Sequence, residues 1–346
     1  MKFSLFAHME RLGPGQDQHA LYDEFVSLCQ FADASGFHAV WTGEHHGMDF
    51  TIAPNPFTLL VDLAHRTQHV RLGTATVVAP FWHPIKLAGE AAMTDLVTGG
   101  RLELGIARGA YTYEFERLGA VGLDAVQAGK RMRALVPAVK GLWDGDFELD
   151  NEFWKFPATT SAPKPVQQPH PPIWIAARDP DSHAFAVANG CHVQCTPLWN
   201  PDDEVESLME RFDAACAERP SCARPKIMVL RHTLVGETEA ELSRYADGLS
   251  QFYNYFGAWF RNNRPVVQGN IQPLTDAEMA ANQMMSPSNM RANNVVGTPD
   301  EVITRLKRYE ELGFDEYSLW VDCGLPYEAK RRSLELFVER VMPAFT

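Results

Sequence analysis

Three consecutive residues, Glu44, His45 and His46, combine a carboxylate with two imidazoles. They follow the short apolar run of residues 38–42 and lead into a loop at Gly47. Burying such groups without partners is costly, so packing alone does not account for them. The imidazole pKa lies near neutral pH, which suits histidine to proton transfer. If the apolar run is a strand of a parallel α/β barrel, these residues stand at the end where barrel enzymes place their active sites.

Charged and polar side chains follow the other apolar runs as well. They are His8, Ala75-Thr76, Arg108, Arg178-Asp179, Thr196, Arg231-His232 and Asp322. In a barrel the carboxyl ends of all strands meet on one face, so these side chains would gather there. Arginines on that face, in a chain with a net charge of −13, favour an anionic ligand such as a phosphate. Ion pairs between the loops are the alternative explanation.

Two of these segments are suited to binding a phosphate. Arg108 precedes Gly109, and an arginine can hold a phosphate through two parallel hydrogen bonds. Asp179-Pro180 opens a predicted helix, whose first N–H groups are free to bind an anion, and Ser182 adds a hydroxyl there.

The elements that must position these residues are predicted from the alternation of apolar runs with helical patterns. Strands are predicted at residues 2–7, 38–42, 70–78, 101–107, 172–177, 191–196, 226–235 and 316–321. Helices are predicted at residues 19–35, 55–67, 88–96, 129–143, 181–188, 201–216, 239–256, 298–312 and 326–341. Eight strands alternating with helices predict an α/β protein of the (β/α)8 TIM-barrel class, with right-handed crossovers.

We expect residues 1–346 to form a single barrel domain with two insertions near the active site. Residues 144–171 are rich in proline, aromatic and polar residues and precede the fifth strand. Residues 257–296 contain Asn, Met, Gln and Pro with weak periodicity. A long segment of this kind in a barrel is typical of a lid or an active-site wall.

The composition sets the broad class of protein. Hydrophobic residues make up 45% and charged residues 22% of the 346 residues, the usual balance of a folded, soluble protein. No apolar run is long enough to predict a transmembrane helix, and residues 1–7 are read as a strand and not as a signal peptide. The acidic net charge argues against nucleic acid or an anionic membrane as a partner. Six scattered cysteines without paired spacing fit inert thiols in the cytoplasm.

Several motifs together resemble the bacterial luciferase-like flavin monooxygenases. They are Glu44–His46, Thr74–Pro80, His83-Pro84, Gly100-Arg101, Gly105–Gly109 and Ile173–Ala177. The resemblance covers most of residues 1–195 and returns at residues 293–312. The pattern is specific to the superfamily and not to a substrate. It implies a barrel that binds reduced FMN at its carboxyl-terminal face, and a homodimer.

The resemblance also implies roles for single residues. Glu44 would lie beside the flavin, His45 would assist the chemistry, and His46 would line the same pocket. The backbone of Ala75 and Thr76 would lie against the isoalloxazine ring.

The FMN phosphate is expected at a second group of residues. Arg108 matches the family's phosphate-binding arginine, and Ser182 with the backbone of Arg178 and Asp179 would complete the site. Arg131 is a further candidate for a phosphate contact, although another arginine two positions later leaves the alignment open.

The function implied is that of a two-component monooxygenase. A separate NAD(P)H:flavin reductase would supply reduced FMN, which reacts with O2 to give a flavin C4a-peroxide that oxygenates a small organic substrate. The protein would orient the flavin and exclude water. The sequence has no site dedicated to nicotinamide, since its glycine-rich segment, residues 99–105, precedes a strand and does not open a helix. Light emission is not expected, because Ala107 stands where light-emitting relatives have a reactive cysteine.

Three alternatives stay open at this point. A luciferase-like oxidoreductase could use the deazaflavin F420 for hydride transfer, although its ligand tail calls for more basic residues. A metal-dependent barrel hydrolase would need clustered ligands, but adjacent His45 and His46 point to different sides of an extended chain, so no metal site is expected. A flavin-binding protein without catalysis would leave the histidines beside Glu44 unexplained.

Overall fold

The barrel strands of the computed structural model pair in a closed, parallel ring. The structure describes residues 1–118 and 122–345. Within these ranges, eight strands follow one another around the ring, and the last pairs with the first. In ring order they are β1 (Lys2–Phe6), β2 (Ala39–Thr42), β3 (Arg71–Thr74), β5 (Leu102–Ala107), β8 (Ile173–Ala176), β9 (His192–Cys195), β10 (Ile227–Val235) and β14 (Glu316–Trp320). The predicted (β/α)8 fold class is therefore confirmed.

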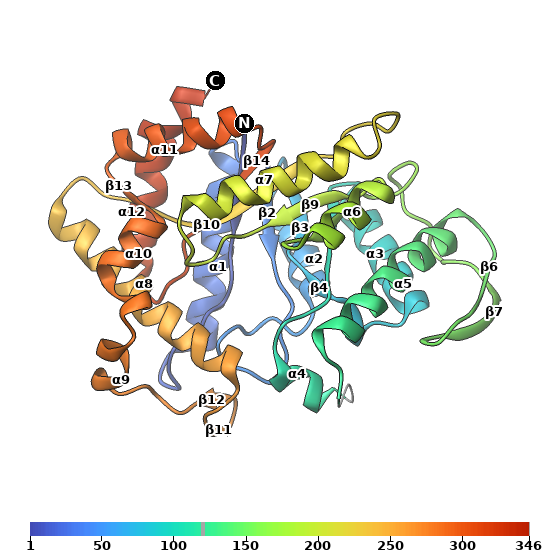
Figure 1. The fold of residues 1–346 in the computed structure, drawn as a ribbon, viewed down its shortest axis with the longest axis horizontal. Coiled ribbons are helices and arrows are strands. Elements are labelled where there is room, and N and C mark those ends of the chain that lie inside the picture. The colour runs from blue at the N-terminus through green and yellow to red at the C-terminus, as the bar shows by residue number, and fades with distance from the viewer. Residues whose placement is uncertain (119–121, 346) are drawn as a thin grey trace.

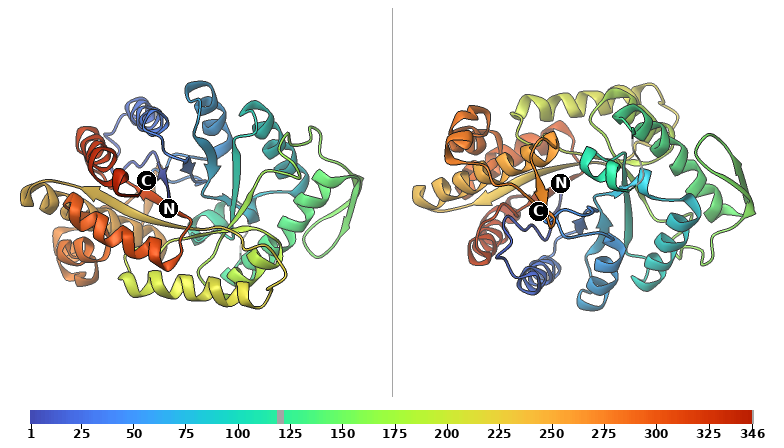
Figure 2. Two further views of the ribbon diagram at one scale, coloured as in Figure 1. Left: turned by 90° about the horizontal axis from the view of Figure 1, so that it is seen from above. Right: turned by 90° about the horizontal axis from the view of Figure 1, so that it is seen from below.

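Helices surround the strands in both views of Figure 2. They are α1 (Gln18–Ala34), α2 (Pro56–Arg66), α3 (Pro84–Val97), α5 (Ala125–Asp144), α6 (Pro180–Ala188), α7 (Asp202–Ala217), α8 (Glu239–Arg261), α11 (Pro299–Leu312) and α12 (Tyr327–Leu336). Each matches a predicted helix with shifted ends. Among the helices of the described ranges, none has the length and apolar composition needed to cross a membrane.

Helix α11 shows how local sequence sets an element's ends. Thr298 and Glu301 form a reciprocal capping box at its start, and Pro299 occupies the first turn, where its missing N–H costs nothing. Gly313 ends the helix at φ 102°, a conformation that side chains disfavour. Both ends lie where the sequence predicts them.

Several short elements differ from the prediction. The strand predicted at residues 70–78 is divided into β3 and β4 (Val77–Val78) by the Ala75–Thr76 peptide bond, which is cis. Helix α4 (Thr112–Arg117) follows β5 and was not predicted. Outside the two predicted insertions, the other short helical segments of the described residues are η1 (Ala79–Phe81), η3 (Phe337–Val341, a π-helix) and η4 (Met342–Phe345).

The two predicted insertions contain secondary structure of their own. In the first, β6 (Phe147–Asp150) and β7 (Lys155–Thr159) form an antiparallel hairpin at the side of the barrel (Figure 1). The second begins with the last turn of α8. Its other elements are β11 (Val266–Val267), β12 (Asn270–Ile271), α9 (Asp276–Ala281), η2 (Gln283–Met285), α10 (Pro287–Asn293) and β13 (Val295–Gly297), which pairs with β10.

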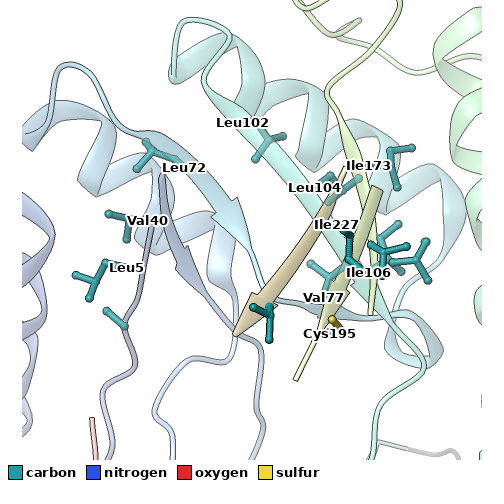
Figure 3. Packing of buried hydrophobic residues seen from close by; sticks show 14 of the residues in the cluster. Leu5, Val40, Leu72, Val77, Leu102, Leu104, Ile106, Ile173, Cys195 and Ile227 are labelled. Atoms are coloured by element: carbon teal, nitrogen blue, oxygen red, sulfur yellow. The ribbon is translucent and has the colours of Figure 1, made fainter. Parts of the chain in front are cut away.

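The barrel interior differs in character from the layer outside it. Aliphatic residues form most of the outer layer, and Leu5, Val40 and Leu104 are among its fully buried members (Figure 3). The indole rings of Trp41 and Trp174 lie 5.4 Å apart. Their strands, β2 and β8, are not neighbours in the ring, so the two rings meet across the interior.

Carboxyl groups hold these two indoles inside the barrel. Trp41 Nε1–H donates to Glu316 Oε1 at 2.8 Å, and Trp174 Nε1–H donates to Glu103 Oε2 at 2.7 Å. Burial of an indole calls for such a partner at its N–H. These four residues, Trp41, Trp174, Glu103 and Glu316, form what we call the floor of the barrel, which is therefore polar as well as aromatic.

The two ends of the barrel have different coverings. Both chain termini lie at one end, where β1 begins, and α4, α9 and the β11–β12 hairpin lie at the opposite end (Figure 1). Because the strands are parallel, that opposite end collects their carboxyl ends.

Candidate functional site

Glu44 is a buried anchor directly after β2. Its Oε2 accepts hydrogen bonds from the Val78 backbone N–H at 2.7 Å and from Trp82 Nε1–H at 2.8 Å. Its Oε1 lies 2.6 Å from Nε2 of His46. The residue is 2% exposed, and these three donors satisfy the buried carboxylate.

A second buried carboxylate holds both histidines. Oε1 of Glu114, from α4, accepts the His46 backbone N–H at 2.6 Å, and Oε2 lies 3.3 Å from Nδ1 of His45. Burial lowers the pKa of His46, but the hydrogen bond to Glu44 and the charges of Glu44 and Glu114 outweigh it and raise that pKa above its usual value. His46 is thus set to carry a proton between two acids.

His45 faces a ring cluster. Its imidazole lies 5.2 Å from the Tyr111 ring and 6.0 Å from the His8 ring, with 18% of the side chain exposed. The His46 side chain is 24% exposed, so both histidines are partly accessible, whereas Glu44 is enclosed. His45 differs from His46 in that its ring faces the aromatic rings, while the His46 ring contacts Glu44.

His8 is a neutral, fixed neighbour of this cluster. Its Nε2 accepts the Gly43 backbone N–H at 3.1 Å, and its own backbone N–H donates to Asp322 at 2.9 Å. Burial, followed by the charges of His45 and His232, lowers its pKa well below the usual value. The side chain therefore accepts hydrogen bonds and does not carry charge.

The backbone at Ala75–Thr76 lies beside an amide with spare hydrogen-bonding capacity. Gln194, on β9, donates to the Thr74 carbonyl at 3.4 Å, while its Oε1 has no hydrogen-bond partner within the described residues. A Cβ atom at Gly105 would lie 2.0 Å from that carbonyl oxygen, so β5 can pack against the Thr74 backbone only because residue 105 is a glycine.

Arg108 and Arg131 both contact segments around α5. Arg108 is exposed after β5 and donates to the Ala125 carbonyl at 3.2 Å. Arg131 donates to the Pro80 carbonyl at 3.3 Å, and its guanidinium lies 5.8 Å from the Phe153 ring of the β6–β7 hairpin. Within residues 1–118 and 122–345, no acid forms an ion pair with Arg108, and its charge acts on Asp179, whose pKa it helps to lower.

The start of α6 holds the other three predicted phosphate contacts. Asp179 is the N-cap of the helix, and its carboxylate accepts the Ser182 backbone N–H at 2.9 Å and the Ser182 hydroxyl at 2.8 Å. Arg178 is exposed, and its nearest acid is Glu204 at 3.6 Å. The helix start is therefore already capped by an acid, with arginines beside it.

One sequence interpretation is wrong. Arg231 and His232 were expected at the rim although they fall inside the strand predicted at residues 226–235. The structure confirms the strand as β10 (Ile227–Val235), so both residues lie within it and not at its end. Arg231 is 1% exposed and donates to Asp202 at 2.6 Å and to Tyr309 at 2.8 Å, which joins helices outside the barrel.

His232 is also structural. It stacks on Trp320 with ring centroids 4.0 Å apart and lies 2.8 Å from the Tyr253 hydroxyl. Burial lowers its pKa to about 3.

Sequence reasoning missed three parts of the site. Glu114 was not singled out, although it is an acid in an aromatic segment directly after a barrel strand. Gln194 and the hydrogen bond from Trp82 to Glu44 were also missed, because the partners Thr74 and Glu44 lie far away in the sequence. Within residues 1–118 and 122–345, no cluster of His, Cys, Asp and Glu side chains is placed to hold a metal ion.

The residues at this face fit reduced FMN in two respects. The spare amide oxygen of Gln194 beside the Ala75–Thr76 backbone offers hydrogen bonding to a heteroaromatic ring. The exposed guanidinium groups of Arg108 and Arg178 offer the charge that a phosphate needs.

Comparison with known proteins gives the following likenesses. A family model for luciferase-like monooxygenases matches residues 1–316. The chain is 59% identical over 346 residues to the oxygenase component of the flavin-dependent trigonelline monooxygenase of Acinetobacter baylyi, covering 100% of this chain and 96% of that protein.

Solved structures share the fold. The monooxygenase RslO1 from Streptomyces bottropensis superposes with a TM-score of 0.83 at 27% identity, covering 100% of both chains. The oxygenating component of 3,6-diketocamphane monooxygenase from Pseudomonas putida, in complex with FMN, has a TM-score of 0.79 at 19% identity and covers 99% of this chain and 98% of its own.

Proposed function

The chain belongs to the luciferase-like monooxygenase family, and we propose that its substrate is trigonelline or a closely related N-methylpyridinium carboxylate. It is a flavin-dependent monooxygenase, the oxygenase component of a two-component system in which a separate reductase supplies reduced FMN. The observation that carries the substrate proposal is the 59% identity, over the whole chain, to the trigonelline oxygenase component. Trigonelline joins a quaternary ring nitrogen to a carboxylate, so its pocket must receive both charges.

Binding of the cofactor is assigned to two parts of the carboxyl-terminal face. Reduced FMN, when bound, supplies the electrons with which O2 is activated for transfer of one oxygen atom to the substrate. We place its ring along the backbone of Ala75 and Thr76. Arg108 and Arg178 are the proposed charge partners of its phosphate. Arg131 would add a further contact.

Ser182 and Asp179 complete the proposed phosphate site in a defined way. Asp179 already caps α6, so a phosphate would meet the exposed arginines first and reach Ser182 only through its hydroxyl. The charge of Asp179 would oppose an anion unless the arginines outweigh it.

Proton control is assigned to the histidines. Glu44 and Glu114 fix His46 and raise its pKa, so it keeps a proton at Nε2. His45, partly exposed beside Tyr111, is the proposed group that exchanges a proton with the reacting oxygen or the substrate. Glu44 acts by positioning.

We propose that residues 144–171 and 257–296 are insertions into one barrel domain, and that the second forms a wall of the site. Phe260 lies 5.7 Å from Tyr111 between ring centroids, and the Gly269 carbonyl accepts the Asp49 N–H at 2.8 Å. The first contact joins the second insertion to the segment between β5 and α4, and the second joins it to the loop that follows Glu44–His46.

We also propose a homodimer in the cytoplasm. Helix α3 exposes Met93, Leu96 and Val97, each more than a third exposed, and such a group of large apolar side chains favours contact with a second copy. A Leu96→Glu variant that stays dimeric in light scattering would exclude this face. All six cysteines are free, which suits a reducing compartment.

The test of the substrate proposal is oxygen transfer. Purified protein is supplied with an NADH-dependent flavin reductase, FMN, 18O2 and trigonelline, and the products are analysed by mass spectrometry. One 18O atom in a product of trigonelline, and none when FMN is replaced by F420, is the expected result. NADH consumption without labelled product would overturn the proposed substrate.

A further inference from the structure

We propose that the carboxylate of Glu10 is the subsite that receives the cationic ring nitrogen of the substrate. This inference rests on the proposed function, because only a cationic substrate class needs such a group. Glu10 lies in the loop after β1, at the carboxyl end of the barrel, and is 6% exposed. Its Oε1 accepts Trp320 Nε1–H at 3.1 Å, whereas Oε2 has no hydrogen-bond partner within residues 1–118 and 122–345.

The charges around Glu10 leave it in need of a cation. Lys330 is the ammonium group nearby, and its Nζ lies 3.1 Å from Asp322 Oδ1 and 3.3 Å from Glu24 Oε2. The carboxyl groups of Glu10, Asp322 and Glu24 thus share the Lys330 ammonium group. Asp322 and Glu24 make the direct contacts with it, and Glu10 does not. The nearby His8 adds no charge, because its pKa is lowered.

Burial and then the charge of Asp322 raise the pKa of Glu10 well above its usual value. Ionised Glu10 is therefore poorly compensated in the substrate-free protein. A bound cation supplies the missing partner, and the cost of burying the carboxylate becomes a source of selectivity for positive charge.

The walls near Glu10 suit an aromatic cation. Trp320 lies beside Glu10 and donates to it. The Tyr111 and Tyr253 hydroxyls are also close enough that the charge of Glu10 adds to the effect of burial in raising their pKa values. The faces of tyrosine rings attract a pyridinium ion. Trp320, which is stacked on His232, instead presents its N–H edge to Glu10 and fixes the carboxylate.

A chain of ring contacts links this subsite to the proposed catalytic group. The Trp320 ring lies 6.0 Å from that of His8, and the His8 ring lies 6.0 Å from that of His45. The Tyr111 ring also lies near that of His45, at 5.2 Å between centroids. A ring held at Glu10 therefore lies within the same aromatic cluster as the group assigned to proton transfer.

The experiment compares two ligands that differ in the ring charge. Binding of trigonelline and of nicotinate is measured by calorimetry on the full-length protein with oxidised FMN present, for wild type, Glu10→Gln and Glu10→Asp. Glu24→Gln is the matched control, since it removes a carboxylate from the same lysine on the solvent side. Thermal melting confirms that each variant is folded.

The expected result is selective. Glu10→Gln weakens trigonelline binding about tenfold or more while nicotinate binding holds or improves, because a charged partner is lost. Glu10→Asp keeps the preference for trigonelline, and Glu24→Gln binds as wild type does. Equal weakening of both ligands in Glu10→Gln and Glu10→Asp would show a structural role, and unchanged trigonelline binding in a folded Glu10→Gln would also overturn the subsite.

These outcomes separate the two proposals. Wild-type protein that transfers 18O to trigonelline, with a Glu10→Gln variant of unaltered selectivity, removes the subsite and leaves the function standing. Wild-type protein that neither binds nor oxygenates trigonelline removes both.

Discussion

The Nε2 atom of His46 lies 2.6 Å from Oε1 of Glu44, two residues earlier in the chain. The other oxygen of Glu44 accepts hydrogen bonds from Val78, at the end of β4, and from Trp82. The Glu44–His46 pair, which follows β2, is therefore also tied to the end of β4. An acid and an imidazole two residues apart at a strand end thus form one hydrogen-bonded unit, and the raised pKa of His46 follows from it.

The His46–Glu44 pair predicts a pH-dependent contribution to stability. Because the pKa of His46 is raised on folding, its contribution is complete below its unfolded value and is lost as pH rises through the folded value. We expect His46→Asn to destabilise the protein more at about pH 5.5 than at about pH 9, relative to wild type at each pH. Urea unfolding at both values measures this. A difference that grows with pH would contradict the assignment.

Arg108 predicts selectivity for the phosphate of the cofactor. Arg108→Ala should weaken FMN binding about tenfold or more while riboflavin, which lacks the phosphate, binds nearly as before. Fluorescence quenching of the two flavins provides the measurement. Arg219→Ala, at an exposed arginine after α7, is the control and should bind both flavins normally. Equal weakening of FMN and riboflavin would mean that Arg108 does not reach the phosphate.

The barrel was predictable because its signals are local. Apolar runs, caps and terminal glycines specify where elements begin and end, as β10 and α11 show. Glu44, His45 and His46 were identified for the same reason, since a single stretch of sequence brings them together.

The contacts that could not be predicted join residues that are far apart in the sequence and meet only in the folded chain. Glu114 meets His45 across 69 positions, and only the path of α4 brings it there. Arg231 was misplaced because the strands of a parallel barrel are buried on both faces, so the apolar pattern does not say which face a polar residue takes. The spare oxygen of Glu10 likewise becomes visible only when Trp320 and Lys330 are placed around it.

His45 and Glu114 should separate catalysis from cofactor binding. His45→Ala is expected to leave FMN affinity within about threefold and to reduce product formation by about 100-fold, the usual contribution of a general acid or base. Glu114→Gln should have a smaller effect in the same direction, because it keeps the shape but weakens the hold on both histidines. Product formation by mass spectrometry and FMN titration give the two readouts. Loss of FMN binding with normal turnover of the bound fraction would reverse the role of His45.

Glu316 predicts an opposite pH dependence inside the barrel floor. Burial raises its pKa to about 7 although Trp41 donates to it, and Glu103 adds to the rise. An acid whose pKa is raised on folding costs stability as pH rises from its unfolded value through the folded one. Glu316→Gln removes the ionisation and keeps an oxygen for the indole N–H.

The variant should therefore match wild type at about pH 5 and be more stable at about pH 8.5, by up to about 3 kcal/mol. Urea unfolding at the two values measures the difference, and Glu335→Gln, a partly exposed carboxyl on α12, serves as the control with no such trend. If Glu316→Gln instead lost as much stability at high pH as at low pH, the carboxyl would be fully compensated by its indole partner. The cost of the polar floor would then lie elsewhere in the barrel.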